Sequence, residues 1–284
     1  MRIEFHRISP TFRYPKRVES HKSHFWEERA MPLPRARFIS AHPFLLPGAP
    51  AIMITRVLIF SALTMISCDD QKEADEPVVD PERGREILEA IKAGKTDHVT
   101  RMIERERNLL YAKDEFGWRP LHLAVRYRRT ELVSFLIRKG ANVNQQDGDG
   151  QTALMWAIEY ERPDYVESLL MVGADPNIRE VSQDWGPLHK ACFYSLPKVV
   201  KMLLDKGADV NHVDETGRSP LLWALTPISH DNRLEVLPLL LMRGADVDVE
   251  NKEGLTPIQI VEGRGGETAG TLVAMLRKYG AVTE

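Results

Sequence analysis

Short apolar runs at helical spacing recur along most of this chain, from about residue 87 to the C-terminus. Within each run, the large apolar side chains fall at positions i, i+3 and i+4, which places them on one face of a helix. Leu132, Val133 and Leu136 form one such face. Each run is too short to bury a core by itself, so we expect short helices that are stabilised by packing against their neighbours.

The helical runs belong to a repeat in which two motifs recur in phase. Equivalent positions of the first motif are separated by 33, 34, 33 and 37 residues. A period of this length indicates one supersecondary unit per repeat. The first motif reads GWRPLHLAV from Gly117, GQTALMWAI from Gly150, WGPLHKACF from Trp185, GRSPLLWAL from Gly217 and GLTPIQIVE from Gly254; the second reads GANVN from Gly140, GADPN from Gly173, GADVN from Gly207, GADVD from Gly244 and GAV from Gly280.

This pair of motifs resembles the ankyrin repeat. The resemblance covers five units from Asp114 to the C-terminus, numbered one to five below, and a degenerate sixth unit precedes them at Ile87–Lys113. It implies an all-α fold: an ankyrin-type solenoid of stacked helix pairs with β-turn fingers, which we assign to residues 85–284, preceded by disordered N-terminal segments. Because each helix pair is apolar on both stacking sides, stacking produces one continuous core.

The histidines of the first motif invite a catalytic interpretation that the repeat does not favour. The resemblance implies that His122 and His189 hydrogen-bond the backbone of the turn. Other units carry Met155, Leu222 and Gln259 at this position, and a catalytic role would not be spread in this way. No Ser/His/Asp set, no Cys/His set and no HExxH motif is present. We therefore predict a protein that is not an enzyme and has no cofactor or bound metal.

A partner-binding surface is the function that the resemblance implies. Proteins of this family bind partners with the finger tips and the exposed side of the first helix, which line a concave groove. Exposed aromatic residues at high density are typical of an interface. The alternative is that some of them pack against neighbouring units. The predicted partner-binding residues, all in units one to three, are Phe116, Trp118, Tyr127, Tyr160, Trp185, Phe193 and Tyr194.

Unit three departs from the pattern of the other units. It has an extra residue in its finger, with Val181 where Asp is expected and Gln183 where Gly is expected. These changes alter the turn that precedes Trp185. The direction in which Trp185 points is therefore open.

The charge of the chain is divided unevenly. Residues 1–52 contain nine Lys or Arg and four Asp or Glu. The chain from Cys68 onward contains 28 Lys or Arg and 37 Asp or Glu, which gives it a net charge of −9. An acidic body has no general attraction for nucleic acid, so we expect no nucleic-acid partner. The two cysteines, Cys68 and Cys192, lie in different segments, and Cys192 is expected to be a buried core thiol.

The longest apolar stretch, MITRVLIFSALTMISCDD, covers residues 53–70. A membrane-spanning helix needs roughly 20 apolar residues, and a core helix would need a polar face that this stretch lacks. Arg56 followed by an apolar run is typical of a secretory signal. The ending MISC resembles a bacterial lipobox, with Met65 in place of the usual Leu. The resemblance implies a lipoprotein-type signal peptide over residues 53–68 and lipid attachment at Cys68.

A signal peptide must lie at the N-terminus, so Met53 is predicted to be the natural start. Residues 1–52 are then a disordered leader that is not part of the natural product. Residues 69–84 are acidic and contain few large apolar residues, so we expect a flexible tether that spans roughly 20–25 Å.

The sequence as a whole favours an envelope lipoprotein, anchored on the periplasmic face of a bacterial membrane, whose repeats bind another protein. A soluble cytosolic adaptor with a cryptic apolar segment is the first alternative. A metal-dependent regulator that uses the HKSH motif at His21–His24 is the second.

Overall fold

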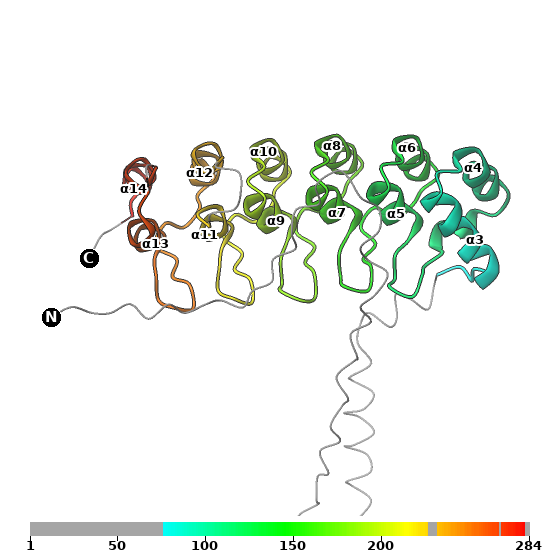
Figure 1. Ribbon diagram of the computed structural model, residues 1–284, viewed down its shortest axis with the longest axis horizontal. Helices are drawn as coiled ribbons and strands as arrows, with labels where there is room; N and C mark the ends of the chain where they lie inside the picture. Colours follow the sequence, from blue (N-terminus) through cyan, green and yellow to red (C-terminus); the bar gives the residue numbers. More distant parts are fainter. Residues whose placement is uncertain (1–75, 227–231, 267, 282–284) are drawn as a thin grey trace, which may run out of the picture. The chain divides into compact units, whose positions relative to one another are not determined.

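The computed structural model describes residues 76–226, 232–266 and 268–281. In this part of the chain the helices form two rows, with α5, α7, α9, α11 and α13 in one row and α6, α8, α10, α12 and α14 in the other (Figure 1). Long loops, the fingers, extend from the first row. This arrangement confirms the predicted solenoid. The elements are α3 Pro81–Lys92, α4 Thr96–Arg105, η1 Arg107–Tyr111, α5 Pro120–Arg126, α6 Thr130–Arg138, α7 Ala153–Glu159, α8 Pro163–Met171, α9 Pro187–Phe193, α10 Pro197–Asp205, α11 Pro220–Ala224, α12 Arg233–Met242, α13 Pro257–Arg264 and α14 Ala269–Lys278.

The degenerate N-terminal unit is a full helix pair, α3 and α4, which packs against unit one through the contact of α3 with α5. Helix α3 begins at Pro81, inside the stretch that we assigned to the tether. The reason is local: the side chain of Asp80 accepts hydrogen bonds from the backbone N–H groups of Glu82 and Arg83, and proline suits the first helical position. The folded body therefore starts a few residues earlier than expected.

The first helix of each unit begins within the first motif, with proline at its first position in units one, three, four and five. His122 Nδ1 accepts a hydrogen bond from the backbone N–H of Arg119 at 3.2 Å, and His189 Nδ1 does the same for Gly186. In unit five, Gln259 Oε1 accepts from Thr256 at 2.9 Å. The predicted structural role of the histidines is confirmed. Burial lowers the pKa of both histidines to about 4, so they are neutral at pH 7.

Small residues allow the first helices to lie close together. Ala124, Ala157 and Ala191 occupy the same position in successive units, and none of them is exposed to solvent. These alanines lie on α5, α7 and α9. Helix α5 packs directly against α7, and α7 packs directly against α9. In units one to three, a larger side chain at this position would crowd the neighbouring first helix.

Asparagines of the second motif join consecutive units. Asn144 donates from its side-chain amide to the carbonyl of Gly173 and accepts from the backbone N–H of Asp175 at 2.8 Å. Asn177 makes the same two bonds to Gly207 and Asp209, at 3.0 and 2.8 Å. A third set, from Asn211 to Gly244 and Asp246, completes the series, which we call the asparagine ladder.

Candidate partner-binding site

The finger of unit one is held by Asp114, the residue that opens it. Asp114 Oδ1 accepts hydrogen bonds from the backbone N–H groups of Phe116 and Trp118 at 3.0 and 2.9 Å. Gly117 between them has a φ of 74°, which glycine adopts without strain. The backbone on either side of Phe116 and Trp118 is therefore fixed before any partner arrives.

Four aromatic side chains from units one and two form a contiguous set, the aromatic cluster: Phe116, Trp118, Trp156 and Tyr160. The ring centroids of Phe116 and Trp118 lie 5.2 Å apart, and Trp118 meets Trp156 edge to face at 5.0 Å. Tyr160 follows at 6.2 Å from Trp156. Trp156 is buried and fixed by a hydrogen bond from its indole nitrogen to Asp147 at 3.0 Å. It supports the three outer rings.

Arg126, the last residue of α5, covers this cluster. Its guanidinium carbon lies 4.7 Å from the ring centroid of Trp118, 5.5 Å from that of Trp156 and 5.9 Å from that of Tyr160. The family resemblance places the position of Arg126 on the binding side, but its contact with rings from two units could not be predicted from the sequence.

Five of the seven predicted binding residues are accessible. Phe116 is 56% exposed and Tyr127 is 37% exposed, while Trp118, Tyr160 and Tyr194 are half-buried. Burial raises the pKa of Tyr160 against the opposing effect of Arg126, and burial also raises the pKa of Tyr194. Both phenols therefore remain neutral hydrogen-bonding groups at pH 7.

The expectation that Trp185 and Phe193 are exposed is wrong. Each is 7% exposed. The indole nitrogen of Trp185 donates to Asp214 Oδ2 at 2.8 Å, and its ring meets Trp223 edge to face at 4.7 Å. Phe193 packs against both tryptophans at 5.2 and 5.5 Å. The hydrogen bond to the next finger turns Trp185 into the core, so both residues support unit four.

The extra residue of unit three changes which residue opens its finger. The backbone N–H of Glu180 donates to the carbonyl of Trp185, as that of Asp147 donates to Gln151 in unit two. Glu180, rather than Val181, therefore holds the opening position. Asp184 has a φ of 58° and takes the place of the glycine, which we had expected at Gln183.

A buried ion pair in unit three replaces a hydrogen bond of its neighbours. In units two and four, a tryptophan of the first helix donates to the opening aspartate, and the two residues lie nine positions apart. In unit three, Lys190 Nζ lies 2.8 Å from Glu180 Oε2, with both side chains almost fully buried. Lys190 is also 3.7 Å from Glu159. The sequence did not indicate this pair, because the extra residue hid the correspondence of Glu180 to the opening aspartates and of Lys190 to the tryptophans of units two and four.

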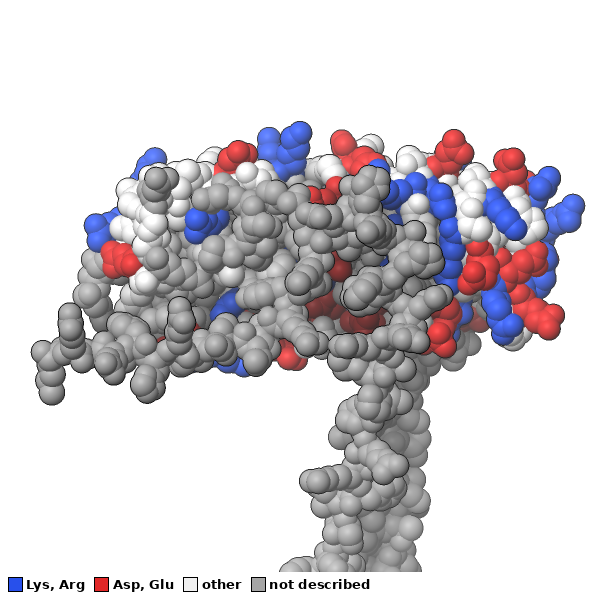
Figure 2. Space-filling view, in the orientation of Figure 1, with Lys and Arg blue, Asp and Glu red and all other residues white. Residues whose placement is uncertain are grey.

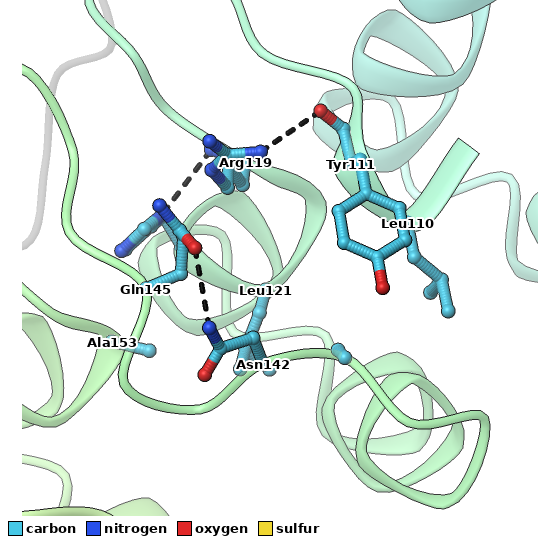
Figure 3. A pocket seen from close by; sticks show the side chains of 9 residues that line it. Leu110, Tyr111, Arg119, Leu121, Asn142, Gln145 and Ala153 are labelled. Carbon is cyan, nitrogen blue, oxygen red and sulfur yellow. Dashed lines mark hydrogen bonds between the residues drawn. The ribbon is translucent and has the colours of Figure 1, made fainter. Parts of the chain in front are cut away.

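The side chain of Arg119, the residue before α5, lies beside η1. Its guanidinium donates to the carbonyl of Tyr111 at 3.0 Å and to the carboxylate of Glu76 at 3.0 and 3.1 Å. Figure 3 shows Arg119 and Tyr111 at the small cavity beside them, which has a volume of about 10 Å³. This space suits at most one water molecule. It is therefore not a ligand site.

Charged side chains of both signs are mixed over the end formed by α3 to α6 (Figure 2). Ion pairs explain part of this mixture, such as Arg83 with Glu86 and with Glu106. The fingers differ: residues 141–152, 174–186, 208–219 and 245–256 contain twelve Asp or Glu and three Lys or Arg. Beyond unit one, the finger side is therefore negatively charged.

The described residues include no group of three or more His, Cys, Asp or Glu placed to hold a metal ion. In the same part of the chain, no helix has the length and apolar character that a membrane span requires. Cys68, the predicted signal peptide and the HKSH motif lie outside the described residues.

Comparison with known proteins identifies related chains. The family model for ankyrin repeats (3 copies) matches residues 87–180 and 178–251. The B-cell lymphoma 3 protein homolog of Mus musculus is 35% identical over 150 residues, which is 51% of this chain and 33% of that protein. Ankyrin repeat and SOCS box protein 6 of Homo sapiens is 39% identical over 148 residues, 50% of this chain and 34% of that protein.

Among solved structures, an ankyrin repeat domain from Acinetobacter baumannii superimposes with a TM-score of 0.63 at 26% identity. The match covers 69% of this chain and 98% of that domain. The chain spans about a third of the length of the two curated relatives described above. The similarity therefore concerns the repeat array and not the whole of those proteins.

Proposed function

Because this chain belongs to the ankyrin repeat family, we propose that its folded body is a non-catalytic module that binds a protein partner in the groove of units one to three. The observation that carries the proposal is the aromatic cluster with its exposed neighbour Tyr127. Tryptophan and tyrosine contribute large contact areas at a low entropic cost, and they are enriched among the residues that dominate binding energies.

The groove residues are positioned before binding. In the fingers of units one and two, Asp114 and Asp147 accept hydrogen bonds from backbone N–H groups, and buried Trp156 fixes the rings above it. A surface that is already ordered loses little conformational freedom on binding. Phe116 and Tyr127 supply the accessible apolar area at the edge, and Trp118 and Tyr160 supply the better-packed centre.

His122, His189 and Cys192 have structural roles in the part of the chain that the structure describes. His122 and His189 are buried and neutral, and their Nδ1 atoms accept backbone hydrogen bonds. Cys192 is buried, and burial raises the pKa of its thiol. A thiol without thiolate character is a poor nucleophile. These observations support binding without chemistry.

The test is capture from a native extract with quantitative proteomics, followed by reconstitution with the purified partner. Trp118→Ala combined with Tyr127→Ala should reduce the affinity at least tenfold, since residues that anchor an interface contribute about 2 kcal/mol or more each. Tyr279→Ala is a matched control, because Tyr279 is 41% exposed at the far end of the array. Unchanged affinity in the double variant would contradict binding in this groove.

We propose further that the array is displayed from a membrane as a lipoprotein, with a lipid on Cys68. Support comes from the sequence of residues 53–68 alone, where Arg56, the apolar run and the ending MISC follow the order of such signals. Several acyl chains together would give stable anchoring. The tether would then end near Asp80, where α3 begins.

Mass spectrometry of the membrane fraction tests this second proposal. We expect a mature N-terminal peptide that starts at lipid-modified Cys68, and a shift to the soluble fraction in the Cys68→Ser variant. Peptides from residues 1–52 in a soluble product would instead favour the cytosolic adaptor.

A further inference from the structure

We propose that Arg126 and the aromatic cluster form a subsite for a carboxylate of the partner, placed next to an aromatic or large apolar side chain of the same partner segment. This inference rests on the proposed function, because it specifies the chemistry of the partner that the groove accepts.

The position of the guanidinium is determined by its contacts. Arg126 lies over Trp118, Trp156 and Tyr160 within 6 Å of each ring centroid, the range of a cation–π interaction. Contacts with rings from two units restrict the rotamers of this side chain. A guanidinium carries five N–H donors, so those that do not contact the Tyr160 hydroxyl remain available to a ligand.

The charge of Arg126 is not neutralised by a carboxylate of the described chain. No Asp or Glu of these residues lies within 4.0 Å of Arg126, whereas Arg162, which stacks at 4.7 Å over Tyr165, binds Asp164 at 3.0 Å. Glu159, beside Tyr160, is directed to Lys190 at 3.7 Å. Arg126 is therefore a half-buried cation that is held by aromatic rings without an opposite charge.

A carboxylate is the group that this geometry fits best. A planar guanidinium binds a carboxylate through two parallel hydrogen bonds, which are stronger than neutral ones. Sites for phosphorylated segments use clusters of arginine, and here a single guanidinium contacts the rings. The acidic fingers of units two to five would also repel a dianion more strongly than a monoanion.

The surroundings of Arg126 define the rest of the segment. Phe116 is 56% exposed and packs against Trp118, and Tyr127, the residue after Arg126, is 37% exposed. Both offer apolar surface to a neighbouring side chain of the partner. The net negative charge of the later fingers disfavours further acidic residues there. The partner segment should therefore carry its carboxylate at the unit-one end and be neutral or basic along the later units.

A random dodecapeptide library displayed on phage tests this subsite. It is selected in parallel on the wild-type protein, on Arg126→Gln, on Trp118→Ala and on Arg218→Gln. Arg218 is a matched control, because its guanidinium stacks at 4.7 Å over Trp223 in unit four and its substitution removes the same charge. The consensus peptide, its Glu→Gln or Asp→Asn counterpart and its phosphoserine counterpart are then measured by calorimetry.

We expect a consensus that joins an acidic residue to an aromatic or large apolar one, and about a tenfold loss of affinity when the acid becomes an amide. The acidic preference should disappear on Arg126→Gln and persist on Arg218→Gln. Three outcomes would overturn the carboxylate assignment without contradicting binding in the groove. They are a consensus without an acidic residue, an acidic preference that persists on Arg126→Gln, and tighter binding of the phosphoserine peptide. Failure to select any consensus on the wild type, or an unchanged one on Trp118→Ala, would count against the groove itself.

Discussion

Lys190 and Glu180 form a buried ion pair at 2.8 Å, at the point where units two and four join a tryptophan to an aspartate. The side chains are 6% and 4% exposed. In unit three the first helix is thus also joined to the residue that opens the finger, but by an ion pair instead of a hydrogen bond. The consequences for stability differ from those of a hydrogen bond.

Removing one member of this pair should be costly. Lys190→Met leaves Glu180 buried without a counter-charge, and we expect a loss of about 3–5 kcal/mol in the free energy of unfolding. The double variant Lys190→Met, Glu180→Leu removes both charges and should recover most of that loss. Urea unfolding of the wild type, both single variants and the double variant measures the coupling. Additive losses would show that the two charges do not interact.

The stability of the protein should fall as the pH drops from about 6.5 to 4. Burial lowers the pKa of His122 and His189 to about 4, below their value of 6.5 in an unfolded chain. Between these values the unfolded state binds more protons than the folded state, so protonation favours unfolding. The contribution is on the order of 3 kcal/mol for each histidine. Thermal unfolding across this pH range measures it.

Unit five provides the control for the histidine effect. Gln259 accepts the same backbone hydrogen bond as the histidines but does not titrate. His122→Gln with His189→Gln should therefore keep the fold and flatten the stability profile between pH 4 and 6.5. An equally steep profile in this double variant would assign the pH dependence to other groups.

The contact of Arg119 with Glu76 should stabilise the N-terminal end of the body. Arg119 is nearly buried, so Glu76→Gln removes a charge-assisted partner and should cost about 1–3 kcal/mol. Glu104→Gln is a control of the same type, because the pair of Glu104 with Lys139 is exposed and should cost less than about 1 kcal/mol. Chemical denaturation monitored by circular dichroism compares the two. Equal losses would mean that burial does not strengthen the Arg119 contact.

Cys192 should resist thiol reagents in the folded protein. It is 1% exposed, and burial raises the pKa of its thiol, so the reactive thiolate is scarce and inaccessible. In the Cys68→Ser variant, which keeps Cys192 as its one cysteine, iodoacetamide should give no adduct under native conditions. A full equivalent should react in concentrated guanidinium chloride. Rapid native labelling would indicate frequent opening of the core around α9.

The periodic features of this fold could be predicted from the sequence, because each helix is specified by residues within its own unit. The apolar spacing located the helix pairs, and the histidines had their predicted contacts. At the N-terminal end, Asp80 and Pro81 start α3 inside the expected tether. That boundary depended on one capping side chain rather than on the repeat.

The groove was less predictable, because the direction of a side chain depends on the neighbouring unit. Trp118 and Trp185 hold related places in their motifs, yet Trp118 remains partly accessible and Trp185 is buried by a hydrogen bond to Asp214. Asp214 lies 29 residues further along the chain. The extra residue in the finger of unit three, together with Glu180 and Asp184, changes the local geometry in a way that the average repeat does not encode.

The asparagine ladder ends before the array does. Asn144, Asn177 and Asn211 each bind the following unit through an amide that both donates and accepts, but the next position is Asp248, whose carboxylate has no N–H to donate. A carboxylate therefore cannot repeat the hydrogen bond that the amides of Asn144, Asn177 and Asn211 donate to the following unit. A terminal unit of a stack has a neighbour on one side only, so under heat or mechanical tension we expect the array to lose its final unit while the surface around Trp118 remains intact. The array would then unfold in steps, beginning with the unit farthest from the proposed binding surface.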